Sequence, residues 1–141
     1  MISPQTKRHA GILLIVLPTV IYGGASLLYR LNYDPRYAQN HLRQDLWRAG
    51  HAHAGVLLLL SLVTLLYLDD ATLSARAKAF VRITVPMSAI LLPAAFFFSV
   101  LTPDAARPNA MIYLAYLGAV ELAAGLVVLG VGLIKTQEIE V

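Results

Sequence analysis

Long uncharged segments alternate with short polar segments along the whole chain. Residues 10–29, 49–68, 83–103 and 108–134 contain no Asp, Glu, Lys or Arg apart from Glu121. A helix needs about 20 mostly apolar residues to cross the roughly 30 Å hydrocarbon layer of a membrane. The pattern therefore predicts an all-α polytopic membrane protein, a four-transmembrane-helix bundle in which a single domain covers the chain. The expected spans are 9–31, 47–68, 80–102 and 109–134.

Composition supports this class and excludes several others. Apolar residues make up 58% of the chain and charged residues 13%, whereas soluble domains carry roughly 25% charged residues. The chain has no cysteine, which excludes disulfides, thiolate metal sites and iron–sulfur clusters. The net charge is +3, but the basic residues flank apolar spans, where they suit anionic lipid headgroups better than nucleic acid. We therefore expect a multi-pass protein of the cell (inner) membrane that contacts the lipid bilayer and binds no nucleic acid.

The basic residues of the loops bear on the orientation in the membrane. The side with both termini and the middle loop has six Lys and Arg residues, and the opposite side has five. Lys and Arg in short loops favour the cytoplasm, so these nearly equal counts do not decide the orientation. Lys7 and Arg8 precede the first span, which usually dominates, and they favour both termini in the cytoplasm.

One acidic residue lies inside a predicted span. Glu121 is near the middle of residues 108–134, where an ionised carboxylate is costly. Gly118, Gly125 and Gly132 share its helix face at seven-residue spacing, which favours close packing against another helix. We expect this face to contact a membrane-protein partner or a second copy of the chain.

The first span offers polar partners for this glutamate. Tyr22 and Thr19 lie at a suitable depth, so Glu121, Tyr22 and Thr19 form the predicted proton or polar site. Two interpretations stay open. Glu121 is either a neutral acid that donates an interhelical hydrogen bond or part of a proton-relay, ion or substrate site.

A second polar cluster begins the second predicted span. His51 and His53 are two residues apart, so they point about 200° apart on a helix. His53 shares its face with small and polar residues that should point into the bundle, whereas His51 points in a more apolar direction. His53 is therefore the favoured functional residue. Imidazole can ligate haem iron, copper or zinc, or relay protons.

Other residues on the same membrane side could complete such a site. His41 is a candidate third metal ligand beside His53 and His51, and Arg48 could hold the propionates of a haem or a lipid phosphate. The cofactor hypothesis is therefore haem or a transition metal, with His53, His51 and Arg48 as binding residues. The structural alternative is that these histidines form interfacial hydrogen bonds to backbone or lipid headgroups.

The run Arg48-Ala-Gly-His51-Ala-His53-Ala-Gly55 resembles the His-containing helices of haem–copper-oxidase-like and related membrane haem proteins. Arg, His-x-His and Gly cluster near one membrane surface in those helices. The whole chain is also similar to small four-span membrane proteins of bacteria. The resemblance to the haem proteins covers eight residues and implies that His51 or His53 ligates haem. The fourth span has no histidine to serve as the opposite axial ligand, which leaves His41 or a second protomer for that role.

These observations leave three functional hypotheses. The first is a haem- or metal-linked redox or respiratory accessory protein built around His51 and His53. The second is a non-enzymatic subunit or assembly factor of a membrane complex, which would bind its partner through the glycine-rich face. The third is a small proton-coupled transporter that uses Glu121.

Overall fold

The structure, a computed structural model, describes the backbone of residues 2–139 and the side chains of residues 2–135. These residues form helices and no strand, which confirms the predicted all-α class. Four helices are long and apolar enough to cross a membrane, as the sequence predicts. In chain order the elements are α1 (Pro4–Tyr33), α2 (Pro35–Ala38), α3 (His41–Leu68), α4 (Ala75–Phe98), the 3₁₀ helix η1 (Ala110–Tyr113) and α5 (Leu114–Ile139).

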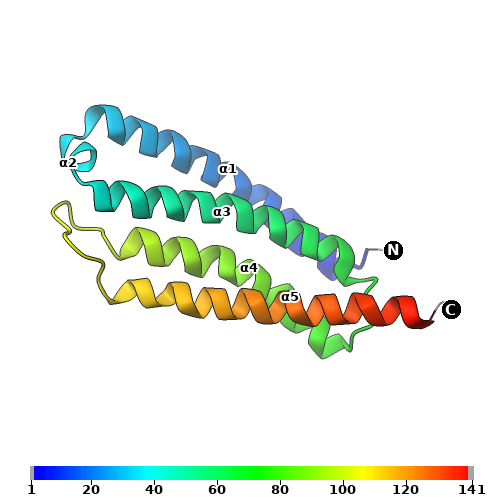
Figure 1. The fold of residues 1–141 in the computed structure, drawn as a ribbon. Helices are drawn as coiled ribbons and strands as arrows, with labels where there is room; N and C mark the ends of the chain where they lie inside the picture. Colours follow the sequence, from blue (N-terminus) through cyan, green and yellow to red (C-terminus); the bar gives the residue numbers. More distant parts are fainter. Residues whose placement is uncertain (1, 140–141) are drawn as a thin grey trace.

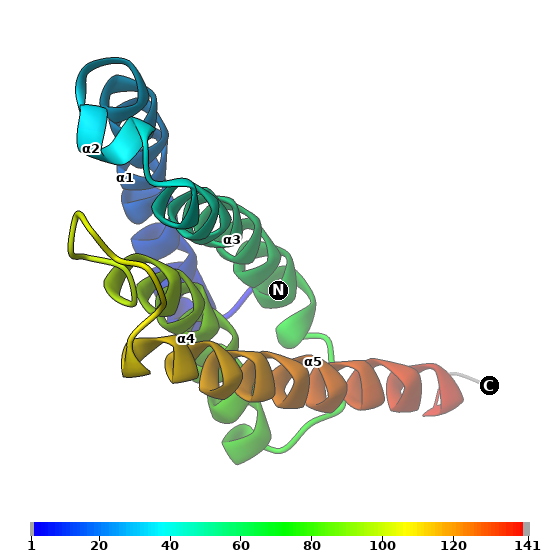
Figure 2. The ribbon, with the colours of Figure 1, turned by 60° about the vertical axis from the view of Figure 1, so that its left-hand side comes forward.

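The long helices form a bundle in which each packs on its neighbour in the chain (Figure 1). Helix α1 packs on α3, α3 on α4 and α4 on α5, and a second view keeps this order (Figure 2). The α1–α3 and α4–α5 connections lie at one end, which we call the hairpin end. Both termini and the α3–α4 connection lie at the other, the terminal end.

Polar side chains in the connections define where the helices begin. Each of five capping side chains accepts a hydrogen bond from a backbone N–H two or three residues later, which satisfies a donor that the first helical turn leaves open. Three of these caps lie in polar flanks, so α1, α3 and α4 begin five or six residues before the predicted spans, at Pro4, His41 and Ala75. Helix α4 also ends earlier than predicted, at Phe98. The caps are Ser3, Asp34, Asn40, Ser74 and Asn109.

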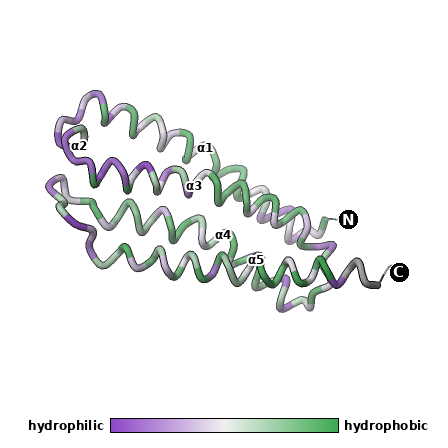
Figure 3. The backbone as a smooth tube through the Cα atoms, viewed as in Figure 1, coloured by the Kyte–Doolittle hydropathy of each residue, from purple (hydrophilic) through white to green (hydrophobic). Residues whose placement is uncertain are grey.

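Hydrophobic residues dominate the middle of the long helices, and hydrophilic residues gather towards the ends and in the first half of α3 (Figure 3). Leu65 and Leu68 of α3 and Val81 and Val85 of α4 belong to one buried cluster. Large apolar side chains also cover the outer faces, and Ile15 of α1 is 77% exposed. On helices of this length and hydropathy, the exposed apolar faces suit contact with the lipid bilayer.

The glycine face of α5 packs against the same chain. A Cβ atom at Gly125 would lie 2.6 Å from Val85 Cγ2, and one at Gly118 would lie 3.1 Å from Leu91 Cβ. Gly132 is equally close to Leu73, which precedes α4. The expected close helix packing is therefore present, because small residues let two helices approach. The expectation that this face contacts a partner is corrected, since α4 and Leu73 already fill it.

A buried polar network joins three helix ends at the terminal end. Arg82 of α4 is 7% exposed and forms an ion pair with Asp69, with 3.6 Å between Nη2 and Oδ1. Its guanidinium also donates to the side chains of Gln5 and Thr6 of α1. The backbone N–H of Ser3 donates to Asp69 Oδ2 over 2.8 Å. Burial opposes ionisation of Asp69, but the Ser3 N–H, the nearby hydroxyls and Arg82 together hold the pKa of this carboxyl below its ordinary value.

A second buried arginine joins α3 to the segment that follows α4 at the hairpin end. Arg43 of α3 donates from Nε to the carbonyl oxygen of Val100 over 3.1 Å and from Nη2 to that of Leu101 over 3.3 Å. The indole N–H of Trp47 donates to the carbonyl oxygen of Phe97 over 3.1 Å. These bonds satisfy carbonyl groups at and just after the end of α4, which has no further helical turn to pair them.

Candidate functional site

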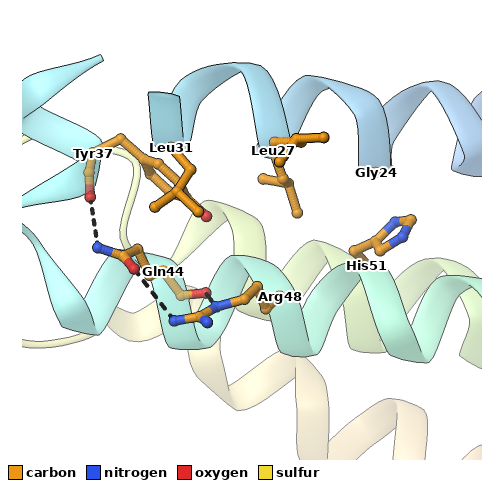
Figure 4. A pocket seen from close by; sticks show the side chains of 8 residues that line it. Gly24, Leu27, Leu31, Tyr37, Gln44, Arg48 and His51 are labelled. Carbon is orange, nitrogen blue, oxygen red and sulfur yellow. Dashed lines mark hydrogen bonds between the residues drawn. The ribbon is translucent and has the colours of Figure 1, made fainter. Parts of the chain in front are cut away.

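A groove between α1 and α3 is lined by two residues of the predicted haem or metal site, Arg48 and His51 (Figure 4). Its volume is about 260 Å³, just below the range of about 300–1,000 Å³ that is usual for ligand pockets. Leucines of α1 form an apolar wall, and polar side chains of α3 form the facing side. The lining residues are Gly24, Leu27, Leu28, Leu31, Tyr37, Gln44, Arg48 and His51.

Hydrogen bonds to Gln44 hold the polar side in place. The buried amide of Gln44 donates to the carbonyl oxygens of Tyr37 and Ala38, which fixes α2 against α3. Arg48 donates from Nε to the carbonyl oxygen of Gln44 and from Nη2 to its Oε1, and Asp45 pairs with the same Nη2 at 3.1 Å. Arg48 Nη1 donates to no group among the described side chains, so one edge of the guanidinium is free to bind a ligand.

Tyr37 of α2 forms the end of the groove nearest the hairpin end of the bundle. Its side chain is 2% exposed, and its ring stacks on Trp47 with 5.5 Å between ring centres. Burial raises the pKa of the Tyr37 hydroxyl, although the neighbouring arginines, Arg48 first among them, oppose that shift. Tyr37 is therefore a neutral wall of the groove at physiological pH.

His51 lies where α1 has no side chain. A Cβ atom at Gly24 would be 2.8 Å from His51 Nε2, and one at Gly23 would be 3.8 Å from Nδ1. The half-buried ring thus occupies space that only glycine leaves open at residue 24. Among the side chains that the structure describes, His51 has no hydrogen-bond partner. An imidazole without a partner can donate to, or accept from, a bound polar group.

His53 lies on a different side of α3 from His51. Its Nδ1 is 2.7 Å from the carbonyl oxygen of Ala49, and its ring packs 5.1 Å from that of Phe96. The stripe expected to face the bundle is indeed buried at Gly50, Leu57, Ser61 and Thr64, but His53 itself is exposed. The preference for His53 over His51 therefore loses its structural basis, because the groove is next to His51.

The structure does not bring together the predicted metal ligands. His41 is exposed and lines a polar hollow of the loops with Arg36 and Asp104, away from the His51 groove. Within residues 2–135, no group of three His, Asp or Glu side chains is placed to hold a metal ion. The set of His41, His51 and His53 is thus not a common site in this structure.

The residues of the predicted proton or polar site, Glu121, Tyr22 and Thr19, do not lie together either. Tyr22 is 76% exposed, and the exposed Thr19 donates its hydroxyl to the carbonyl oxygen of Val16 in its own helix. Both belong to α1, which packs on α3, whereas Glu121 belongs to α5, which packs mainly on α4. The expectation that Tyr22 or Thr19 pairs with Glu121 is corrected, because α3 and α4 lie between the two helices.

Several residues of the groove carry no obvious signal in the sequence pattern. Leu27, Tyr37 and Gly24 line it, although nothing in their local sequence indicates a binding site. Gln44 is different, because its spacing of four residues from Arg48 places both on one helix face, and this signal could have found it. Comparisons of the chain with known protein families, curated proteins and solved structures found no match.

Proposed function

We propose that the protein binds a membrane-soluble amphiphile in the groove between α1 and α3. Arg48 and His51 hold a polar head that carries oxygen acceptors, and the leucines of α1 contact its apolar part. A phospholipid phosphate and a quinone carbonyl share this acceptor chemistry. The protein would thus be a binding protein whose site lies near the membrane surface. It would take part in redox chemistry only if its ligand is a redox-active molecule such as a quinone.

The observation that carries this proposal is the unpaired, half-buried ring of His51 in an apolar groove whose rim carries the exposed Arg48. Arg48 Nη1 and both ring nitrogens of His51 lack partners among the described residues, although Leu27, Leu28 and Leu31 line the opposite wall. The ring of His51 is half-buried, and such polar groups are normally paired, whereas the side chain of Arg48 is exposed and can reach a ligand head. A ligand head with oxygen atoms would pair them, and its chain would extend along α1 towards the lipid.

Trp47 supplies a direct assay, because it is the single tryptophan of the chain and stacks on Tyr37 at the end of the groove. We would reconstitute the protein in vesicles that contain brominated phosphatidylglycerol or brominated phosphatidylcholine, whose bromine atoms quench nearby tryptophan. A short-chain benzoquinone is the second probe. Preferential quenching by the anionic lipid identifies a phosphate head, and saturable quenching by the quinone identifies a carbonyl head.

The matched variants are Arg48→Gln and His51→Ala, with His53→Ala as the control on the neighbouring face. We expect Arg48→Gln to weaken binding of the preferred probe about tenfold, since a hydrogen bond to a charged group contributes about 1.5–3 kcal/mol. His53→Ala should bind like the wild type. Equal, non-saturable quenching by every probe in all four proteins would contradict the proposal.

A second candidate is the haem-linked redox role, and the unpaired ring of His51 is the observation that favours it. If a haem were bound, His51 would be the residue to hold its iron and Arg48 the residue to hold its propionates. The described residues offer no second histidine opposite His51, so a second copy of the chain would have to supply one. An optical spectrum of gently extracted protein tests this role. A Soret band that His51→Ala removes and His53→Ala retains would support it, and a colourless, metal-free protein would exclude it.

We also propose that both termini lie in the cytoplasm, because Lys7 and Arg8 precede α1. The termini lie at one end of the bundle (Figure 1). Single cysteines at Gln39 and Ala75, both exposed, report the hairpin and terminal ends. In intact cells an impermeant maleimide should label the Gln39→Cys protein and not the Ala75→Cys protein. The reverse pattern would invert the orientation, and labelling of both would contradict the four-span topology.

A further inference from the structure

A second groove lies between α1 and α4, in the half of the bundle towards the terminal end. Its volume is about 270 Å³. Helices α1 and α4 both pack on α3, and the buried Leu58 of α3 also lines the groove. The apolar walls are open to the lipid, because each of five wall residues is at least 38% exposed. These are Ile12 and Val16 of α1 and Ile83, Met87 and Ile90 of α4.

Polar side chains line one end of this groove. Arg82 borders it and bonds to the side chains of Gln5 and Thr6, which links α4 to α1 there. The half-buried His9 also borders it and donates from Nδ1 to the carbonyl oxygen of Gln5 over 2.9 Å, which leaves Nε2 for a ligand. Arg82 Nε is buried without a hydrogen-bond partner in the described part of the chain. An oxygen atom seated beside Arg82 would supply the missing acceptor.

The chain around this polar end is positively charged. Residues 4–10 and 75–82 contain five Lys and Arg residues and no Asp or Glu, and the loop before α4 adds two acids, Asp69 and Asp70. Arg8 is four residues before the wall residue Ile12, and Arg76 is seven before Ile83, so each lies on the side of its helix that continues into the groove wall. Both arginines are exposed. An excess of basic side chains at a membrane surface attracts anionic lipid headgroups.

The length of the groove matches one leaflet of a bilayer. From Arg82 to Ile90, α4 rises about 12 Å, which is most of the roughly 15 Å of hydrocarbon in one leaflet. His9 and Arg82 each directly precede an uncharged segment, residues 10–29 and 83–103, which places the polar end at the membrane surface. A transmembrane helix of a partner would continue through both leaflets, whereas the groove ends at Ile90. A phospholipid has the matching form, with a charged head at the surface and acyl chains in one leaflet.

We propose that this groove binds one anionic phospholipid from the leaflet at the terminal end. The long side chains of Arg8 and Arg76 reach the headgroup from the two helices, and His9 contacts it from the groove. One acyl chain lies between α1 and α4, over Leu58. The site is separate from the groove of Arg48 and His51, which lies between α1 and α3 towards the hairpin end, so it does not depend on the function proposed above.

A photoactivatable phosphatidylglycerol with a diazirine in one acyl chain tests the proposal in lipid bilayers. Illumination forms a carbene that inserts into neighbouring side chains, and peptide mapping locates the adducts. We expect labelling within residues 12–16 and 83–90. Excess unlabelled phosphatidylglycerol should remove this labelling, and excess phosphatidylcholine should not. Equal labelling of all lipid-facing helix surfaces, with no difference between the two competitors, would overturn the proposal.

Charge variants separate a built site from general attraction to anionic lipid. Arg8→Gln and Arg76→Gln should each lower the preference for phosphatidylglycerol over phosphatidylcholine about fivefold, the effect of one basic residue near an anionic surface. Lys135→Gln is the matched control, because it removes one charge from an exposed residue of α5 outside the groove. It should leave the preference unchanged. An equal loss in all three variants would show an effect of net charge alone and would contradict the site.

Two further variants test where the acyl chain lies. Met87→Trp places a larger side chain in the groove without changing the charge, and it should abolish the competed labelling of residues 12–16. Met87 is 38% exposed, so the indole has room to remain outside the core and the helical fold should be retained. Arg48→Gln, in the other groove, should label like the wild type. Undiminished labelling of Met87→Trp would place the lipid outside the groove and contradict the proposal, as would loss of labelling in Arg48→Gln.

Discussion

The guanidinium of Arg43 lies 4.4 Å from the centre of the Trp47 ring, one helical turn further along α3. The same guanidinium donates to the carbonyl oxygens of Val100 and Leu101, and the indole donates to that of Phe97. Two neighbouring side chains of α3 thereby hold the end of α4. Because Tyr37 also stacks on Trp47, the same contacts support the groove.

Replacing Arg43 by lysine should therefore loosen the hairpin end. Lysine cannot reproduce the planar fork that bonds two carbonyl oxygens and stacks on an indole. We expect a loss of about 1.5–3 kcal/mol in the free energy of unfolding, the usual effect of a hydrogen bond to a charged group. Denaturant unfolding in detergent micelles, followed by Trp47 fluorescence, measures this loss. Arg107→Lys, at an exposed residue, is the control and should change stability by less than about 0.5 kcal/mol.

Gly24→Ala should close the groove without unfolding the protein. The new methyl group would lie 2.8 Å from Nε2 of His51, so the histidine ring must rotate away. Saturable quenching of Trp47 by the preferred probe should then decrease about tenfold, as for loss of a charged hydrogen bond. Gly23→Ala is the matched control, because its methyl group would make an ordinary 3.8 Å contact with the same ring. Equal binding by both variants would show that the ring position does not matter.

Gly125→Ala should separate α4 from α5. Its methyl group would lie 2.6 Å from Val85 Cγ2 and 2.8 Å from Thr84 Oγ1, and both residues are buried. Overpacking of this kind costs about 1–3 kcal/mol. Gly130→Ala, with no atom within 4 Å of the new methyl group, should be neutral or slightly stabilising, because alanine is the better helix former. Thermal unfolding of the two variants in the same detergent compares them directly.

The stability of the terminal end should depend on acid pH. The pKa of Asp69 is lower in the folded protein than its ordinary value of about 3.9. Ionised Asp69 therefore stabilises the fold above that value, and this stabilisation is lost as the pH falls through the folded pKa. Asp69→Asn should cost about 1.5–3 kcal/mol at neutral pH, and the difference from the wild type should shrink below about pH 4. Circular dichroism melts at a series of pH values measure both effects, with exposed Asp104→Asn as the control.

The four spans were predictable because an apolar, charge-free segment of about 20 residues or more is typical of a membrane helix and rare in soluble domains. The hydropathy pattern predicted a start for α3 that is six residues too late. The reason is that Arg43 and Gln44 are polar residues that are buried with their hydrogen bonds satisfied. A hydropathy pattern assigns such residues to a loop. The cap at Asn40 was the local signal for the earlier start.

The candidate site was harder to predict, since a helix face does not reveal which helix covers it. His53 shares a buried stripe with Gly50 and Ser61, yet it lies at the edge of that stripe, against Phe96. His51 gains its groove from Gly24, which is 27 residues away in the chain. The glycine face of α5 is another case in which the sequence does not reveal the partner helix. Its close packing was predictable, but only the folded chain shows that α4 provides the opposite surface.

The neighbour-by-neighbour order of the long helices has a consequence for biosynthesis. Each span packs on the span made just before it, so helix pairing can follow membrane insertion step by step during translation. The bonds of Arg82 to Gln5 and Thr6 depart from this order, because they join α4 to residues of α1 that are 77 and 76 positions away. These bonds can form only after α4 has emerged, and until then the start of α1 has the bond from Ser3 to Asp69 at that end but not those to Arg82. The newly made protein thus passes through a stage in which α1 and α3 are paired while the polar network of the terminal end is still incomplete.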